Sequence, residues 1–156
     1  MISLRMLKNT ITDFQFLKYI ENEHEDAGNA SPYSDEALTI FLQGHQDLYL
    51  DKQLRLLIEE VNTPVGFIDL YNFDTHTQKA SIGIIIAKQY RHKEYAKQAI
   101  INLVDYAFKT LHLQALEASI PKQHVGSRKL FERCGFATTN KGADIVTYHI
   151  THAMLG

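Results

Sequence analysis

The feature that most restricts the fold of this chain is a nearly continuous apolar strand followed at once by an amphipathic helix. Residues 80–86 read ASIGIII, and apolar side chains recur at three- and four-residue steps over residues 96–111. A strand without polar alternation is typical of the centre of a sheet that is covered on both faces. The segment therefore predicts a layered α/β fold in which helices pack against a central sheet.

The remaining segments show strand and helix patterns without a repeat or a linker. Alternation or short apolar runs predict strands at residues 2–6, 54–61, 65–71, 80–86, 113–120 and 143–151, and helical periodicity predicts helices at residues 12–20, 34–42, 96–111 and 127–134. With 156 residues the chain is long enough for one hydrophobic core, so we expect a single α/β domain over residues 1–156.

The composition is that of an ordinary globular protein, with 45% hydrophobic and 22% charged residues. A net charge of −2 offers no chain-wide basic field for nucleic acid. The sequence shows no signal peptide and no apolar stretch of membrane length, so the expected location is cytoplasmic, with no membrane partner. The single cysteine, Cys134, excludes an internal disulfide, and the histidines lack a metal-ligand spacing such as HExxH, so we predict no metal.

Positive charge is concentrated where the long helix begins. Arg91, His92 and Lys93 directly precede it, and Lys97 lies one turn into it. The free N–H groups and the positive dipole end of a helix N-terminus stabilise an anion such as a phosphate. The pattern indicates a pyrophosphate site at the end of strand 80–86, and a run of solvated surface charges is the alternative interpretation of the same residues.

Two motifs in the correct order resemble those of the GNAT superfamily of N-acetyltransferases. The first, Arg/Gln-x-x-Gly-x-Gly/Ala, corresponds to residues 91–96 (RHKEYA). The second, Asn-x-x-Ser followed by a helix with a Tyr and a terminal Gly-Phe, corresponds to residues 124–127 (HVGS) and 129–136 (KLFERCGF). The acidic segment 21–34 and the hairpin around VGFIDLYNFD are similar to the branch that contains ribosomal-protein N-terminal and spermidine acetyltransferases.

The resemblance implies a mixed, mostly antiparallel sheet that splays beside strand 80–86 into a V-shaped cleft. It also implies an acetyl-CoA-dependent enzyme that acetylates a primary amine by direct attack in a ternary complex. The acceptor would be a protein N-terminus, a polyamine or a small amine. The implied acetyl-CoA contacts are the backbone of Ile84, Ile85 and Ile86, the loop residues Arg91, His92, Lys93, Glu94, Tyr95, Ala96 and Lys97, and His124, Ser127, Lys129 and Phe131 of the second motif.

Three residues depart from the family pattern. Glu94 replaces the middle Gly, and its carboxylate either caps the helix and points outward or repels the pyrophosphate. His124 replaces Asn, and it either donates a comparable hydrogen bond or is a solvent-facing loop residue. Phe131 replaces a Tyr and has no hydroxyl for a general acid, a role that water, Tyr95 or Tyr148 could take. These departures motivate a second hypothesis, a catalytically weak CoA-binding, sensor or interaction module.

Acidic and aromatic residues outside the motifs are candidates for the amine site. Glu21 and Glu25 share one helical face and could attract a cationic acceptor, or could form a solvated helix end. Asp69 and Tyr71 lie on one face of their strand, and Asp69 is the candidate catalytic base or amine anchor. Strand 143–151 is the expected place of a homodimer contact. An unrelated nucleotide-binding protein is disfavoured, because neither GxGxxG nor a P-loop motif occurs.

Overall fold

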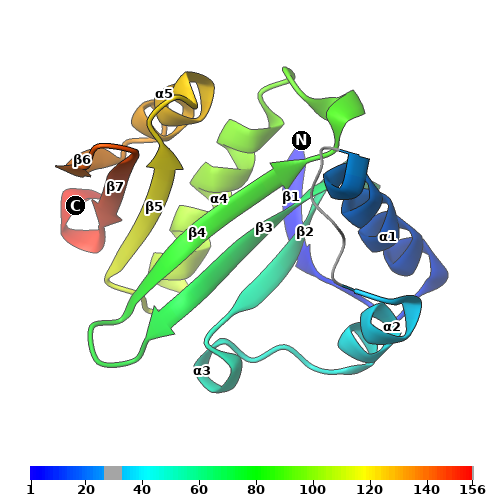
Figure 1. Cartoon of the computed structure of the whole chain (residues 1–156). Helices are drawn as coiled ribbons and strands as arrows, with labels where there is room; N and C mark the ends of the chain where they lie inside the picture. Colours follow the sequence, from blue (N-terminus) through cyan, green and yellow to red (C-terminus); the bar gives the residue numbers. More distant parts are fainter. Residues whose placement is uncertain (27–32, 156) are drawn as a thin grey trace.

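The computed structural model describes residues 1–26 and 33–155, apart from the side chains of residues 24–26. Its seven strands form one sheet in the order β1-β2-β3-β4-β5-β7-β6 (Figure 1). The strands are β1 (Ile2–Met6), β2 (Leu54–Glu60), β3 (Thr63–Asp74), β4 (Lys79–Ile86), β5 (Ala115–Pro121), β6 (Ala137–Lys141) and β7 (Ile145–Thr151). The helices are α1 (Ile11–Asp26), α2 (Asp35–Gln43), α3 (Leu48–Asp51), α4 (Tyr95–Lys109) and α5 (Val125–Arg133), with 3-10 turns η1 (Lys88–Tyr90) and η2 (His152–Leu155).

The sequence prediction misses two short elements, α3 and β6. Helix α3 has only four residues and begins where the Asp47 carboxylate accepts hydrogen bonds from the N–H groups of Tyr49 and Leu50. Strand β6 is exposed at all five positions, so no apolar alternation marks it. Because β6 pairs with β7, it is β6 that forms the last strand of the sheet, and a homodimer contact through residues 143–151 stays a prediction.

The sheet is antiparallel except between β4 and β5. Those two strands pair in parallel over three positions only, from Lys79 with Ala115 to Ser81 with Glu117. Beyond this point β4 stays paired with β3 and β5 stays paired with β7. The two strands therefore diverge (Figure 1), and the predicted V-shaped opening beside strand 80–86 is confirmed.

Helices cover both faces of the sheet, as the apolar character of β4 predicts. The larger core cluster joins one face to α4, with Ile82 and Leu103 among its buried members. The smaller cluster joins the other face to α1 and α2 through residues such as Leu38, Leu57 and Phe67. Side chains alternate between these two faces along each strand. The opening between β4 and β5 is an opening in the sheet itself, so it lies between the helical layers on the two faces.

A buried ion pair fastens the start of α1 to β1. Asp13 is only 1% exposed and accepts hydrogen bonds from the Arg5 guanidinium at 2.8 and 2.9 Å and from the Lys8 N–H at 2.6 Å. Burial by itself raises the pKa of the Asp13 carboxyl, but these donors together hold that pKa below its usual value of 3.8. The pair thereby fixes the helix that carries Glu21 and Glu23.

The Asp13→Asn variant tests this ion pair through its pH dependence. Because the folded pKa lies below the unfolded one, the stabilisation by Asp13 is complete above about pH 4 and is lost as the pH falls through the folded value. At pH 7 we expect D13N to lower the free energy of unfolding in urea by about 2 kcal/mol, and the deficit should shrink below about pH 4. Asp105→Asn, which breaks an exposed pair with Lys109, should change it by less than about 0.5 kcal/mol. A D13N deficit that does not change with pH would contradict this account.

Gly66 allows β3 to approach β4 closely. A Cβ at this position would overlap the carbonyl oxygen of Ile85 and lie 3.0 Å from Cα of Ile86. A Cβ at Gly83 of β4 would meet Cε1 of Tyr71 at 3.5 Å, which is an ordinary contact. We therefore expect Gly66→Ala to lower the free energy of unfolding by about 3 kcal/mol, and Gly83→Ala to change it by less than about 1 kcal/mol. Similar urea midpoints for the two variants would show that the approach of β3 and β4 is not close.

Candidate active site

The edge of β4 that faces the opening presents backbone groups from alternate residues. The N–H of Ala87 donates to the carbonyl of Val65 at 2.9 Å, which identifies the residues whose backbone faces β3. By alternation Ile85 faces β3, whereas Ile84 and Ile86 face the opening. The prediction of three consecutive backbone contacts is therefore corrected to Ile84 and Ile86, since neighbouring peptide groups of a strand point to opposite sides.

Arg91 closes the end of this edge. Its Nε donates a hydrogen bond to the carbonyl oxygen of Ile86 at 3.0 Å. The guanidinium is thus held beside the point where β4 ends and the opening is widest. This places a permanent positive charge next to the backbone groups of Ile84 and Ile86.

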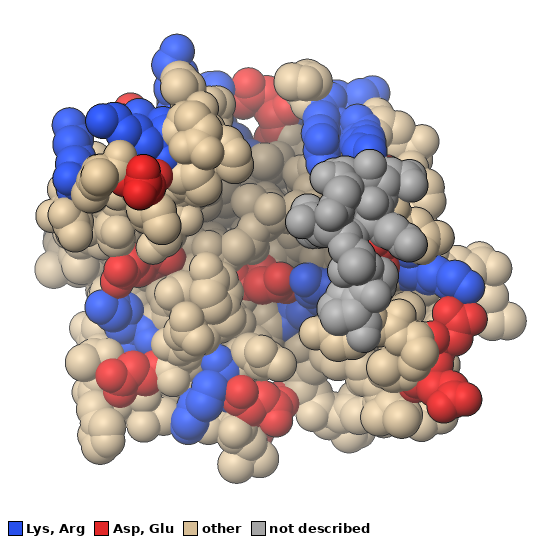
Figure 2. All heavy atoms as spheres, in the orientation of Figure 1, with Lys and Arg blue, Asp and Glu red and all other residues tan. Residues whose placement is uncertain are grey.

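The loop between β4 and α4 holds two non-glycine residues in the left-handed region. His92 and Glu94 both have a φ of 65°. Such residues, alternating with neighbours of negative φ, turn successive N–H groups toward one side and form a concave anion site. The side chains of Arg91, His92 and Lys93 are exposed, and Lys97 is half-buried. Figure 2 shows Lys and Arg side chains on both flanks of a hollow over the ends of β4 and β5.

Glu94 occupies the N-cap position of α4 without capping the helix. Its side chain makes no hydrogen bond to the backbone there. Both carboxylate oxygens instead accept from Nη2 of Arg133 at 3.1 Å, across from the last turn of α5. The interpretation of Glu94 as a helix cap is therefore wrong, and its effect on a pyrophosphate stays a prediction. Arg133 offsets the negative charge that the loop would otherwise carry alone.

Residues of the second motif lie on α5, on the other flank of the opening. His124, Ser127 and Lys129 are exposed, and His124 is the N-cap residue without a side-chain cap bond. Phe131 is 3% exposed and packs edge-to-face on Phe136, with ring centroids 5.1 Å apart. Phe131 is thus a core residue, and the cofactor contacts of these four residues stay predictions.

Tyr148, one alternative for the missing general acid, is fully buried. Its hydroxyl donates to Oε2 of Glu132 at 2.7 Å and accepts from Nε of Arg128 at 3.1 Å. Because its hydroxyl already donates to Glu132, Tyr148 would have to break that hydrogen bond before it could donate to a reacting group. Tyr95, the other alternative, is half-buried in the first turn of α4.

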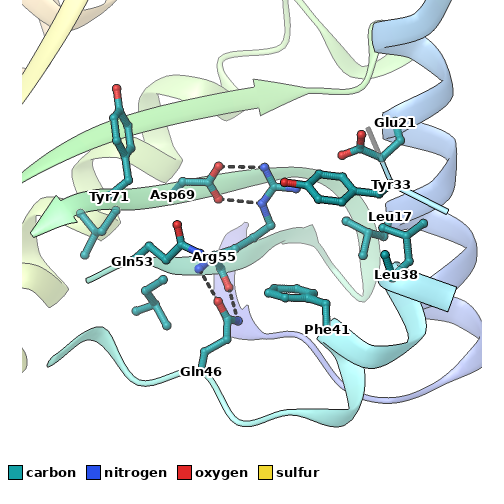
Figure 3. Close-up of a pocket in the computed structure, with 13 residues that line it drawn as sticks. Leu17, Glu21, Tyr33, Leu38, Phe41, Gln46, Gln53, Arg55, Asp69 and Tyr71 are labelled. Atoms are coloured by element: carbon teal, nitrogen blue, oxygen red, sulfur yellow. Dashed lines mark hydrogen bonds and ion pairs between the residues drawn. The ribbon is translucent and has the colours of Figure 1, made fainter. Parts of the chain in front are cut away.

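A pocket of about 420 Å³ lies between β2, β3, α1 and α2 (Figure 3). Asp69 lines it, but both carboxylate oxygens accept from Arg55, Oδ1 from Nε at 2.8 Å and Oδ2 from the terminal nitrogen at 2.9 Å. A carboxylate whose two oxygens are both engaged by one bidentate guanidinium has less room to accept a hydrogen bond from an incoming amine than a free one. The structure therefore does not favour Asp69 as the catalytic base.

Glu21 and Tyr71 also line this pocket, so three of the four acceptor-site candidates converge on it. Glu21 enters from α1 and Tyr71 from β3 (Figure 3). The Tyr71 ring lies over Gly83 of β4, which places the phenol between the pocket and the β4 strand. The side chain of the fourth candidate, Glu25, lies outside the described residues.

Sequence reasoning missed two residues of the site, Arg55 and Glu23. Arg55 lies among the apolar residues at the start of β2, directly opposite Asp69, a position that only the pairing of β2 with β3 reveals. Glu23 is 8% exposed and accepts from the N–H of Lys88 at 3.2 Å, so it joins α1 to the start of the loop between β4 and α4. Its acidic neighbours in the sequence concealed this role, because the whole segment predicted a cation-attracting surface.

Both the sequence and the fold of this chain are similar to those of known proteins. A family model of the acetyltransferase (GNAT) domain matches residues 3–137. The chain belongs to the GNAT acetyltransferase family. The family resemblance that residues 91–96 and 124–136 predicted is thereby confirmed.

Two sequence relatives and one solved structure illustrate the likeness of this GNAT chain. It is 26% identical over 112 residues to an uncharacterized N-acetyltransferase of Bacillus licheniformis, a match that covers 69% of this chain and 63% of the relative. It is 35% identical over 79 residues to a candidate ribosomal N-acetyltransferase of Bacillus subtilis (strain 168), covering 51% and 43%. The matches thus span less than two thirds of either relative. The fold is shared with spermidine N-acetyltransferase from Vibrio cholerae in complex with CoA and spermine, at a TM-score of 0.82, 20% identity, and coverage of 99% and 98%.

Residues 1–26 and 33–155 contain neither a membrane-spanning helix nor a cluster of metal ligands. No helix there combines the length and the apolar character that crossing a bilayer requires. The described side chains also include no group of three or more His, Cys, Asp and Glu residues arranged to hold a metal ion.

A glycine at position 94, as in the family motif, tests whether the Glu94 carboxylate weakens anion binding at this loop. Glu94→Gly removes a left-handed non-glycine residue, which costs about 1 kcal/mol, and a carboxylate near the anion site. We expect the dissociation constant for acetyl-CoA, measured by calorimetry, to fall about threefold to tenfold. Arg133→Gln leaves the Glu94 carboxylate without its cation and should raise that constant. Weaker binding by E94G would show that the Glu94–Arg133 pair supports the loop instead of opposing the ligand.

Proposed function

We propose that residues 1–156 form one catalytic domain that transfers an acetyl group from acetyl-CoA to a primary amine. The observation that carries the proposal is the edge of β4 that faces an opening in the sheet and ends at a loop with left-handed residues at His92 and Glu94, a backbone form that suits an anion. A strand edge can pair with an extended amide-containing chain as it would with another strand. The pantetheine arm of CoA is such a chain, and its pyrophosphate is such an anion.

The residues then have distinct roles. Ile84 pairs with the pantetheine arm through its backbone groups, and Ile86 through its N–H, because the Ile86 carbonyl oxygen already accepts from Arg91. The N–H groups of residues 91–97, together with Arg91 and Lys97, hold the pyrophosphate. Bound acetyl-CoA would supply an activated thioester carbonyl, and N–H donors at the β4 edge would stabilise the oxyanion formed when the amine attacks directly. The C–S bond would then break, and CoA would leave as the thiol after its sulfur takes up the proton that the amine loses, by way of water.

The acceptor amine enters from the pocket that Glu21, Asp69 and Tyr71 line. Tyr71 spans the distance between this pocket and β4, so the two substrates meet beside its phenol. Holding both substrates together in a ternary complex accounts for most of the rate enhancement that such a site can deliver. The name of one similar protein supports a ribosomal amine as the acceptor, and the name of another supports a polyamine as the alternative. We propose a cytoplasmic location for the enzyme.

A second candidate function is supported by the position of the aromatic hydroxyls. Phe131 has no hydroxyl, and the hydroxyl of Tyr148 is already hydrogen-bonded to Arg128 and Glu132. A domain that binds CoA and turns over amines slowly, as a sensor or interaction module, fits these two facts. Binding of acetyl-CoA without acetylation of any amine would favour this candidate.

The pyrophosphate role is tested by thermal unfolding with and without millimolar acetyl-CoA. At about 100 times its dissociation constant a ligand stabilises by roughly 2.7 kcal/mol, which raises the Tm by on the order of 5 °C. We expect Arg91→Glu to abolish most of this rise. Lys18→Glu, a charge reversal at an exposed α1 residue that pairs with Asp35, should leave it intact.

Equal shifts for the two variants would remove Arg91 from the cofactor site. AMP and spermidine serve as ligand controls, because a shift with either alone would report general anion or cation binding. No shift of the wild-type protein with acetyl-CoA would count against the proposed function as a whole.

A further inference from the structure

We propose that Arg55 determines which amines the acceptor pocket binds. Its guanidinium acts as a tethered cation, a positive charge held in place inside the pocket, and it limits acceptors to amines with one positive charge. This inference rests on the proposed function. It concerns a residue to which the family motifs give no role, and it makes a prediction about which amines react.

The charges that line the pocket are few. Among the described lining residues, Glu21 and Asp69 are acidic and Arg55 is basic, so the formal charges sum to −1. The rest of the described lining is uncharged, with apolar side chains such as Leu38 and Phe41. Such a pocket balances one ammonium group, together with an apolar body, better than it balances a chain of ammonium groups.

Arg55 is held in this pocket from three directions. Its guanidinium forms the bidentate pair with Asp69 and lies 4.9 Å from the centroid of the Phe67 ring. Its backbone N–H donates to Oε1 of Gln46 at 2.7 Å, and its carbonyl accepts from Nε2 of Gln46 at 2.8 Å (Figure 3). The cation therefore cannot leave the pocket without breaking several contacts at once.

The charge on Arg55 is also permanent. Burial lowers the pKa of the guanidinium, but the hydrogen bonds and charge of Asp69, with a further contribution from the charge of Glu21, raise that pKa above its usual value. An incoming amine consequently meets Asp69 already paired with a cation. A second ammonium group of the same acceptor would lie near Arg55 and be repelled. This repulsion disfavours diamines without improving any contact to monoamines.

A purely structural role is the competing account. Arg55 and Asp69 are direct cross-strand partners, and opposite charges in that position stabilise a sheet wherever they occur. The two accounts differ in what they predict for substrates. A structural pair affects all acceptors equally, whereas a tethered cation affects those with two charges more than those with one.

The test compares n-hexylamine with 1,6-diaminohexane, which differ only in the second amine, as acceptors with acetyl-CoA. The quantity measured is the ratio of kcat/KM for the diamine to kcat/KM for the monoamine. Arg55→Gln should raise this ratio by about tenfold or more, mainly through KM of the diamine, because the pocket charge becomes −2. Arg55→Lys keeps the charge and should leave the ratio within about threefold of wild type.

Lys79→Gln is the matched control, because it also removes the cation of an ion pair within the sheet, with Glu117, outside the pocket lining. It should leave the ratio unchanged. Asp69→Asn, which brings the pocket charge to zero, should lower the ratio and serves if R55Q does not fold. A ratio of kcat/KM values cancels any loss of rate that both amines share.

An unchanged ratio in folded R55Q, or equal changes in R55Q and K79Q, would overturn the role of Arg55 while leaving the acetyltransferase proposal standing. A wild-type protein that binds acetyl-CoA but prefers the diamine would do the same. Failure of the wild-type protein to acetylate either amine or to bind acetyl-CoA would instead overturn both proposals.

Discussion

The site depends on one constraint of the sheet: β4 and β5 are each fully paired with a different neighbour. β4 follows β3 up to Ile86, and β5 follows β7 up to Pro121, so only three residue pairs join β4 to β5. Past Ser81 the backbone groups of Ile84 and Ile86 face an opening, where the Ile86 carbonyl oxygen accepts from Nε of Arg91. Backbone polar groups strongly require partners. An edge of this kind suits a ligand that can hydrogen-bond like a strand, which is the basis of the proposed cofactor site.

The parts around the opening share a rigid frame. Asp13 binds α1 to β1 through Arg5, and Glu23 on the same helix accepts from the N–H of Lys88 at the start of the anion-binding loop. Helix α1 therefore forms a wall of the pocket and also supports the loop between β4 and α4. The backbone of that loop adopts left-handed conformations at His92 and Glu94, which costs on the order of 1 kcal/mol for each residue and is maintained by the surrounding contacts.

Charge in the two halves of the site is arranged by pairing carboxylates with arginines. Glu94 is turned to Arg133, away from a cap position, and Asp69 is engaged by Arg55. In each pair a carboxylate that would dominate its surroundings is offset by a guanidinium from a neighbouring element. Glu94 thereby adds no unpaired negative charge to the loop between β4 and α4, and the charged residues of the described pocket lining carry a formal charge of −1 in place of −2.

Much of this protein is determined by local pattern. Residues 80–86 and 96–111 specify a central strand and a covering helix through their periodicity, and the motifs at residues 91–96 and 124–136 indicate the family. Short exposed elements such as β6 carry no periodicity and could not be predicted. Contacts between distant residues were equally hidden: Arg55 meets Asp69 only through strand register, and Glu94 meets Arg133 only because α5 packs beside α4. Sequence determines which faces are apolar, because that is a local property, whereas tertiary structure decides which charges neutralise one another, because a charge pair depends on distance in space.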